Sequence, residues 1–110
     1  PHQQQQIRVQ LSMGLVAVLS QQLLPRATGS GRVLSMEIMM PNAAIRNLIR
    51  EDKLHQVYSQ MQVGQGGSGM QTMNQSLAAL IMRQAISMEE AFLASNDQDE
   101  LRQILGGARR

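Results

Sequence analysis

Two glycine-rich stretches have the composition of a phosphate-binding loop. Residues 64–69 fit the spacing G-x-x-x-x-G, but Met70 and Gln71 follow where such a loop needs Lys and then Ser or Thr. Residues 28–32 have Arg in place of that Lys, and a strand pattern rather than a helix pattern follows them. Because neither stretch has the groups that neutralise the β- and γ-phosphates, both are predicted to be connecting loops.

No other residues have the spacing of a catalytic or metal site. Cys is absent, and His2 and His55 lie too far apart in the sequence to argue for a shared metal. The acidic residues in 89–90 and 97–100 fall in the first turns of expected helices, where negative charge favours the helix dipole. That placement accounts for them without acid–base chemistry. We therefore expect no catalytic residue and no metal or other cofactor in this chain alone.

The stretch from Ala44 to Glu51, Ala-Ile-Arg-Asn-Leu-Ile-Arg-Glu, has the pattern of a short amphipathic helix. Arg46 and Arg50 fall at i and i+4, where two like charges cost about 0.2–0.5 kcal/mol. A helix built for stability alone would more often place Glu opposite Arg, so the pair is a candidate contact surface. The spacing alone also fits a surface helix with two solvated arginines. The apolar residues form one stripe at i, i+3 and i+4: Ile45, Leu48 and Ile49.

Composition limits the classes of function. The 110 residues suffice for one compact domain, and nine Met with other aliphatic residues must fill a core nearly without aromatics. The net charge of +2 arises from 10 basic and 8 acidic residues without a basic block, which disfavours nucleic-acid binding. No apolar run approaches the roughly 18 residues of a transmembrane segment, and no signal peptide is visible. The absence of Cys suits a cytosolic protein, and the start at Pro1 indicates a piece cut from a longer chain.

Residues 3–24 have a helical pattern that Pro25 is expected to end. Gly14, inside the pattern, costs about 1 kcal/mol against Ala and is expected to mark a close packing contact. The apolar residues of this segment recur at steps of three and four: Ile7, Leu11, Leu15, Val18, Leu19 and Leu23.

A hairpin is predicted next. Residues 28–31 form its turn, and alternation over 32–40 predicts a strand that pairs with 23–27. A lone two-stranded hairpin is marginal in water, so this pair is expected to belong to a larger sheet. One face of the strand is wholly apolar and the other is mixed, as in a half-buried strand, and the apolar face is expected to be exposed in this piece and to favour self-association: Leu34, Met36, Ile38 and Met40.

Short helices fill the rest of the chain. Asn42 is expected to cap the helix at 44–51, and Asp52 the next one. Residues 87–90 have the spacing of a capping box, in which side chain and backbone bond reciprocally at a helix start. Further helices are predicted at 53–62, 70–84, from 87 onward, and from 97 to the glycines at 106–107. The predicted fold class is mainly α with a small β-hairpin.

Several stretches together resemble the PilT family of type IV pilus retraction ATPases. Residues 44–51 match that family's AIRNLIRE motif letter for letter. Each of the other matching pieces is weak alone, but the resemblance runs essentially from His2 to Leu105. These pieces follow in the family's order and spacing: 6–8, 11, 20–25, 31–33, 37–39, 69–73, 75–77 and 99–101.

The resemblance implies a cytoplasmic, ring-shaped homo-hexamer, peripheral to the inner membrane, with a PAS-like N-terminal domain and a RecA-like P-loop ATPase domain. It implies that 1–41 is the tail end of that ATPase core, with its last helix and edge hairpin, and that 42–110 is a C-terminal helical subdomain. The Walker A and Walker B segments would precede this chain, so ATP and Mg²⁺ would bind the parent protein elsewhere. The implied function is pilus retraction and twitching motility.

The resemblance also implies roles for residues. The motif is tied to retraction rather than to ATP hydrolysis, and its apolar stripe would anchor the helix. The turn from Gln22 to Arg26 would lie near the adenine of the nucleotide. The polar residues of the motif would face a neighbouring subunit or the pilus machinery at the inner membrane: Arg46, Asn47, Arg50 and Glu51.

Two alternatives stay open. The first is the accessory retraction ATPase, a close paralogue without so clean a match at 44–51, and the second is a non-catalytic helical adaptor or interaction domain. Pilus assembly and type II secretion ATPases share the core fold but usually carry a Cys-based zinc site, which this sequence lacks. A G-x-x-x-x-G-K-[ST] loop about a hundred residues upstream would support an ATPase and exclude the adaptor.

Overall fold

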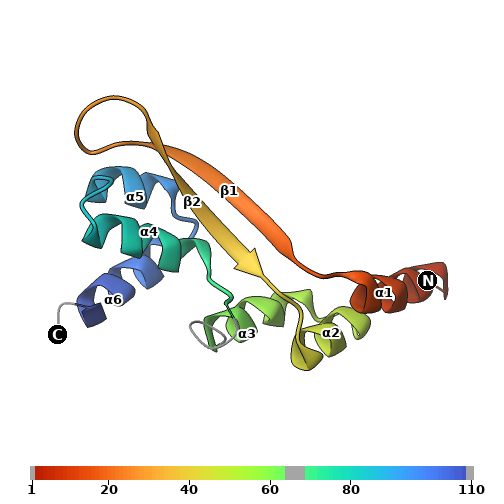
Figure 1. Cartoon of the computed structure of the whole chain (residues 1–110). Coiled ribbons are helices and arrows are strands. Elements are labelled where there is room, and N and C mark those ends of the chain that lie inside the picture. The colour runs from red at the N-terminus through yellow and green to blue at the C-terminus, as the bar shows by residue number, and fades with distance from the viewer. Residues whose placement is uncertain (1, 64–68, 109–110) are drawn as a thin grey trace. The chain divides into compact units, whose positions relative to one another are not determined.

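The structure, a computed structural model, describes residues 2–63 and 69–108 (Figure 1). These residues are mostly helical with a two-stranded sheet, in which β1 pairs with β2 across the loop at residues 26–31, and this confirms the predicted fold class. The elements follow in this order: α1 (His2–Gly14), β1 (Val18–Pro25), β2 (Arg32–Met39), α2 (Ala43–Arg50), the single-turn η1 (Leu54–Gln56), α3 (Val57–Val63), α4 (Met73–Met82), α5 (Met88–Ala94) and α6 (Gln98–Ala108).

The chain divides into two compact units. The first combines the residues up to Leu19 with Ile38–Gln71, and the second combines Ser20–Glu37 with the residues from Thr72 onward. The two strands of the hairpin pass from one unit to the other. The boundary at residue 41, which the family resemblance implies, concerns the parent protein and stays a prediction.

The helix predicted over residues 3–24 is wrong in its second half. α1 ends at Gly14, and Val18–Pro25 forms strand β1, so that Pro25 ends a strand rather than a helix. In this strand Leu24 is buried while Leu23 is exposed, which is the alternation of a pleated strand. The pairing with β2, which was predicted only for residues 23–27, decides the conformation and overrides the helical periodicity.

Gly14 does not mark a packing contact. Among the described residues, no heavy atom lies within 4 Å of the position that a Cβ would take at Gly14. Gly14 instead is the last residue of α1. The segment that follows leads directly into β1.

The two faces of β2 differ in burial within the second unit. Leu34, on the apolar face, is exposed, whereas Ser35, on the mixed face, is fully buried. The Ser35 hydroxyl donates to Oγ of Ser76 at 2.9 Å, and the Met36 amide donates to the same oxygen at 3.1 Å. The amide of Met73 donates to Oε1 of Glu37 at 3.1 Å. On the mixed face, Ser35 is thus buried with its hydroxyl hydrogen-bonded to α4.

The core of the second unit lies between α4, α5, α6 and one residue of β1 (Figure 1). α4 begins at Met73, three residues after the predicted start, and a capping box between Thr72 and Gln75 marks its start. Ser87 accepts from the amide of Glu90 at 3.2 Å, as its predicted cap requires. α6 continues through the glycines at 106–107, where the sequence predicted its end. The core consists of Leu24, Leu77, Ala78, Leu80, Ile86, Ala91, Leu101 and Leu105.

Candidate functional site

The motif helix α2 begins where the sequence predicts. Asn42 has extended backbone angles (φ −104°, ψ −175°), and its Oδ1 accepts from the amide of Ile45 at 2.9 Å. This bond satisfies one of the amides that a helix start leaves without a partner. The cap therefore fixes the first residue of α2 and, with it, the direction in which each motif side chain points.

The end of α2 is a Schellman turn, the helix ending in which one residue takes left-handed backbone angles. The amide of Asp52 donates to the carbonyl of Ile49 at 3.2 Å, and the amide of Lys53 donates to that of Leu48 at 2.8 Å. Asp52 has φ +59°, which is unusual for a residue with a side chain. The prediction that Asp52 caps the next helix is wrong, because it terminates α2 instead.

The apolar stripe of α2 faces the core of the first unit. Ile45 and Ile49 are buried and Leu48 is half-buried, so the three residues at the predicted spacing share one side of the helix. The buried cluster around them consists of Ile45, Ile49, Met61 and Met70, with Leu15, Met39, Met40 and Val57 packed against it. Burial of such side chains stabilises the helix by roughly 1.5–3 kcal/mol each, which outweighs the repulsion between the two arginines.

The two motif arginines lie in different environments. Arg46 is half-buried, and its Nη1 donates to the main-chain carbonyl of Ser12 in α1. Arg50 is exposed and donates to Oδ1 of Asn47, one turn earlier in the same helix. Each guanidinium therefore donates to an oxygen acceptor of its own, which offsets part of the repulsion between the two charges. The remaining polar residues of the motif, Asn47 and Glu51, are exposed.

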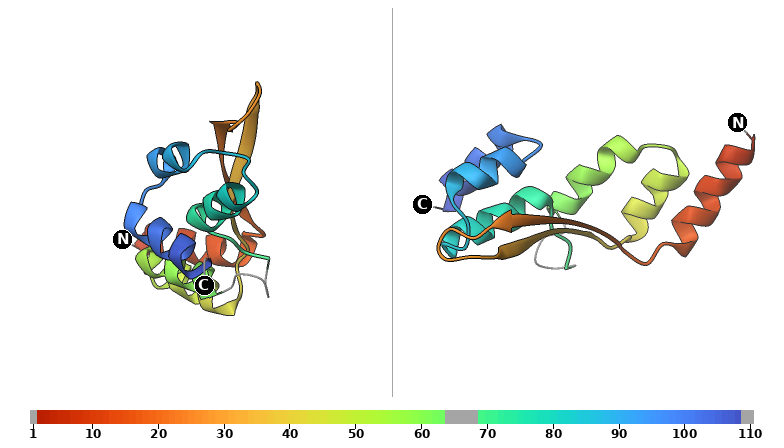
Figure 2. Two further views of the ribbon diagram at one scale, coloured as in Figure 1. Left: turned by 90° about the vertical axis from the view of Figure 1, so that its left-hand side faces the viewer. Right: turned by 90° about the horizontal axis from the view of Figure 1, so that it is seen from above.

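Helix α1 lies beside α2 in both views of the first unit (Figures 1 and 2). A salt bridge joins Nη2 of Arg8 to Oδ2 of Asp52 at 3.1 Å, and Nε2 of Gln5 donates to the carbonyl of Arg50 at 3.4 Å. Sequence reasoning missed both contacts, because the residues lie on segments far apart in the chain. The one local signal was the pair of like charges at Arg46 and Arg50, which indicated α2 as a candidate site but did not indicate α1 as its neighbour.

The residues expected near a nucleotide lie in the second unit. Gln22 is half-buried, and its Nε2 donates to the carbonyl of Ala94 at 3.5 Å. Arg26 is exposed at the start of the hairpin turn, and its amide donates to the carbonyl of Gly31 at 3.2 Å. The turn at 28–31 is a connecting loop, as predicted, with Gly29 and Gly31 at positive φ. Of the other predicted loop, residues 64–68 lie outside the described part of the chain.

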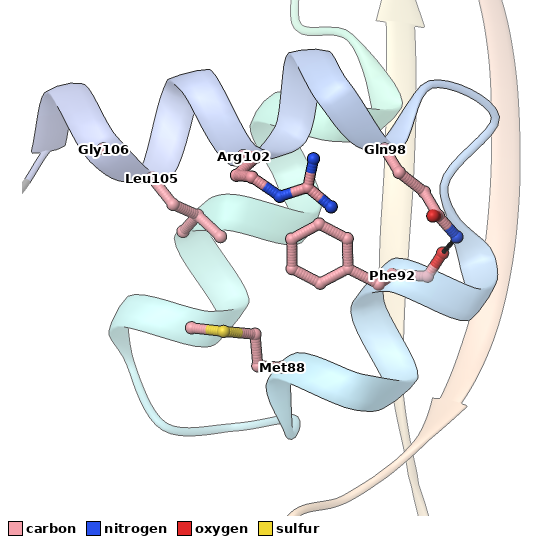
Figure 3. A pocket seen from close by; sticks show the side chains of 6 residues that line it. All are labelled: Met88, Phe92, Gln98, Arg102, Leu105 and Gly106. Atoms are coloured by element: carbon pink, nitrogen blue, oxygen red, sulfur yellow. Dashed lines mark hydrogen bonds between the residues drawn. The ribbon is translucent and has the colours of Figure 1, made fainter.

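A surface pocket lies between α5 and α6 (Figure 3). It has a volume of about 450 Å³ and is lined by Met88, Phe92, Gln98, Arg102, Leu105 and Gly106. The Arg102 guanidinium stands 5.5 Å from the centroid of the Phe92 ring, and Nε2 of Gln98 donates to the Phe92 carbonyl at 2.7 Å. Asp99 pairs with Arg102 at 2.8 Å. The pocket thus has an apolar wall and one neutralised cation.

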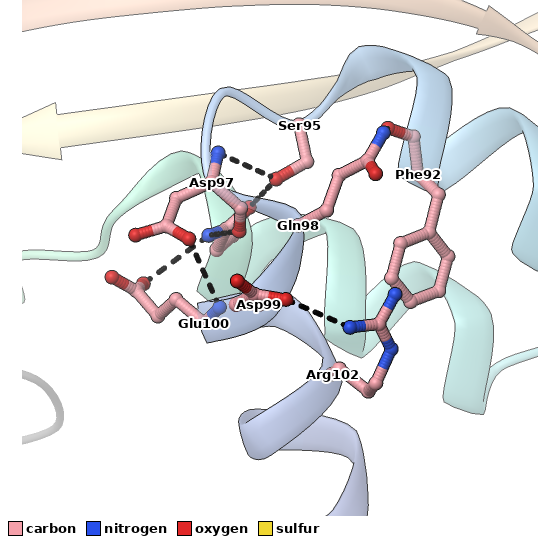
Figure 4. A network of polar contacts seen from close by, with 8 residues as sticks. Phe92, Ser95, Asp97, Gln98, Asp99, Glu100 and Arg102 are labelled. Carbon is pink, nitrogen blue, oxygen red and sulfur yellow. Dashed lines mark hydrogen bonds and ion pairs between the residues drawn. The ribbon is translucent and has the colours of Figure 1, made fainter.

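A polar network holds the turn between α5 and α6 (Figure 4). The buried side chain of Asn74, on α4, accepts from Oγ of Ser95 at 2.6 Å and donates to the carbonyl of Asp97 at 3.0 Å. Oδ1 of Asp97 accepts from the amide of Glu100 at 3.1 Å and so caps α6. The acidic residues here therefore serve a helix start, as their positions in the sequence predicted.

Across 2–63 and 69–108, no three His, Cys, Asp or Glu residues come together in a way that could hold a metal ion. Within the same ranges, no helix has the length and apolar character needed to cross a membrane. The candidate site is the motif helix α2 with its neighbour α1, which contact each other through named side chains.

The fold is that of one region of a pilus retraction motor. A solved structure described as the pilus retraction motor PilT with bound ADP matches with a TM-score of 0.78 and 50% identity. The match covers 92% of this chain and 27% of that one. No family model matches the chain.

Over most of its length this chain is similar to one region of the PilT family of type IV pilus retraction ATPases. It is 49% identical over 89 residues to the twitching motility protein of Neisseria gonorrhoeae, and 48% identical over 85 residues to the retraction ATPase PilT of Pseudomonas aeruginosa. These matches cover 81% and 77% of this chain but 24% of each relative, so the chain spans about a quarter of their length. The type IV pilus ATPase PilU of P. aeruginosa is 30% identical over 100 residues, 91% of this chain and 26% of PilU.

Proposed function

We propose that this chain is the C-terminal region of a hexameric cytoplasmic ATPase that powers type IV pilus retraction and twitching motility. In this proposal residues 1–41 end the RecA-like core and 42–110 form the helical subdomain, while ATP and Mg²⁺ bind elsewhere in the parent protein. The observation that carries the proposal is the identity of 48–49% to proteins named for retraction and twitching. The chain's part is to couple ATP hydrolysis to pilus disassembly.

The exposed side of α2 is the surface that performs this coupling. Its apolar side is buried, so the helix is anchored and the polar side is presented in a fixed orientation. That side carries Asn47, Arg50 and Glu51, all exposed. We propose that it contacts a neighbouring subunit or the pilus machinery at the inner membrane, since an exposed arginine recognises carboxylates and carbonyls with defined geometry.

Replacing Arg50 by Ala in the full-length protein tests this role. Hexamer formation and ATP turnover are expected to stay within about twofold of the parent protein, while twitching is lost, because the surface contacts a partner and not the nucleotide. Zone diameter on soft agar measures twitching, and phosphate release measures turnover. Arg102→Ala, which removes an exposed arginine from the second unit, is the matched control and should keep twitching. A loss of turnover as large as the loss of motility would contradict the coupling role.

A second element of the proposal places Gln22 and Arg26 near the nucleotide of the assembled protein. Its support is their position on the hairpin that ends the proposed ATPase core. In the full-length protein, Arg26→Ala should weaken the binding of a fluorescent ADP analogue several-fold, whereas Arg32→Ala, at the other side of the turn, should weaken it less. Equal affinity for the parent protein and Arg26→Ala would remove this assignment.

The two rival functions differ in what supports them. The identity to PilU is 30%, against 48% to PilT of the same organism, which favours retraction proper over the accessory role. A helical adaptor would have no phosphate-binding loop upstream. Reading the gene upstream of this chain distinguishes the adaptor from the ATPase, because only the ATPase requires G-x-x-x-x-G-K-[ST] there.

A further inference from the structure

The carboxyl end of α1 has no cation of its own. α1 ends at Gly14, and in its last turn, which the structure describes in full, none of the residues is basic. The last carbonyls of a helix lack partners within the helix and carry the negative end of its dipole. Leu15 donates its amide to the carbonyl of Leu11 at 3.0 Å, which leaves the carbonyl of Ser12 to be satisfied from outside the helix.

Arg46 provides that cation from α2. Its Nη1 donates to the Ser12 carbonyl, which is a charge-assisted hydrogen bond at the negative end of a helix dipole. Ser12 is itself buried, with 1% of its surface exposed, and its hydroxyl donates to the carbonyl of Val9 at 2.7 Å. The contact is therefore partly shielded from water, where a similar bond between fully exposed groups would contribute little.

The same pair of helices is joined at its other end. The salt bridge from Arg8 to Asp52 and the bond from Gln5 to the carbonyl of Arg50 join α1 to the carboxyl end of α2. Leu15, directly after α1, packs on the buried cluster around Ile45 and Ile49. A shift of α1 along or about its axis must consequently displace α2 with it.

We infer that Arg46 is a positioning residue that fixes the motif helix to the carboxyl end of α1, while Arg50 alone of the two arginines meets the partner. The inference rests on the proposed function, because positioning matters only if the exposed side of α2 is used. It assigns different roles to two identical residue types in one motif. Arg46 acts through the orientation of α2, and Arg50 acts by contact.

The test compares three variants of the full-length protein. Arg46→Met keeps the apolar stem but removes the cation and the donor, Arg46→Lys keeps the cation, and Arg50→Met makes the first change on the exposed side. Hydrogen exchange of the amides in residues 11–15 reports the end of α1, and twitching reports function. Arg46→Met should speed exchange there about tenfold or more, as expected for the loss of a hydrogen bond to a charged group, and should abolish twitching.

The conservative variant separates positioning from general stability. Arg46→Lys should restore most of the exchange protection and of the twitching, whereas Arg50→Met should leave exchange unchanged and still lose twitching. Unchanged exchange in Arg46→Met would overturn the inference. Restored exchange without restored twitching in Arg46→Lys would overturn it as well, because Arg46 would then contact the partner itself. Normal twitching in Arg50→Met would instead contradict the proposed function. The positioning role of Arg46 would then be tested by the exchange measurement alone.

A second variant covers the case in which Arg46→Met fails to fold. Asp52→Asn removes the charge that pairs with Arg8 but keeps a residue type that accepts left-handed backbone angles. It loosens the same helix pair from the other end, so it should raise exchange in α1 and reduce twitching by a smaller factor. Asp52→Asn with both readouts unchanged would count against a coupled pair of helices.

Discussion

Single polar residues decide how several segments of this chain are held. Arg46 joins α2 to α1, and Glu37 on β2 accepts from the first amide of α4. Asn74 bonds to both sides of the turn before α6. In each case one side chain satisfies main-chain groups of another element, which is why its removal costs more than the contact itself contributes.

Asn74→Ala is expected to destabilise the chain. The change leaves the hydroxyl of Ser95 and the carbonyl of Asp97 without the partner they have in the folded state, at a cost of about 2–3 kcal/mol. Urea unfolding of the 110-residue chain, followed by circular dichroism, measures the free energy of unfolding. Asn96→Ala is the matched control, since Asn96 lies exposed in the same turn and should change the stability little. Equal effects of the two changes would show that the network contributes nothing.

At the scale of the elements, helix ends and strand pairing explain which sequence-based predictions are correct and which are wrong. α2 was predictable because its signals are local: Asn42 as a cap, apolar residues at i, i+3 and i+4, and a pattern long enough for two turns of helix. β1 was not, because its conformation depends on pairing with β2. The end of α6 was missed because Gly106 and Gly107 suggest a stop, yet both remain helical.

Gly107→Ala is expected to stabilise the chain. Gly107 is helical and exposed, and among the described residues no heavy atom lies within 4 Å of the place that an alanine methyl group would take there. Ala therefore gains about 0.5–1 kcal/mol from reduced backbone entropy in the unfolded state. Gly29→Ala is the matched contrast, because Gly29 is equally open but has φ +77°. That change should cost roughly 1–2 kcal/mol. Thermal unfolding of both variants measures the difference, and a common sign for the two changes would contradict this account.

At the scale of the whole molecule, the sequence revealed the family and the motif helix but not the internal contacts of the candidate site. The stripe of α2 and its cap follow from neighbouring residues, whereas Arg8 meets Asp52 only after the chain has passed through a hairpin. The burial of Ser35 on β2 was missed for the same reason. Leu34 is the more hydrophobic residue, but Ser35 is the buried one, because it hydrogen-bonds to Ser76, which is distant in sequence. Partners that are distant in sequence carry no local signal, and the site is built from them.

Position 52 has little freedom to vary. The backbone there is left-handed, which Gly, Asn and Asp tolerate best, and the side chain must also carry a negative charge toward Arg8. Gly and Asn tolerate the left-handed backbone but carry no negative charge. Glu carries the charge but tolerates that backbone less well. A short acidic side chain is thus the one common choice that ends one helix and tethers another at the same time.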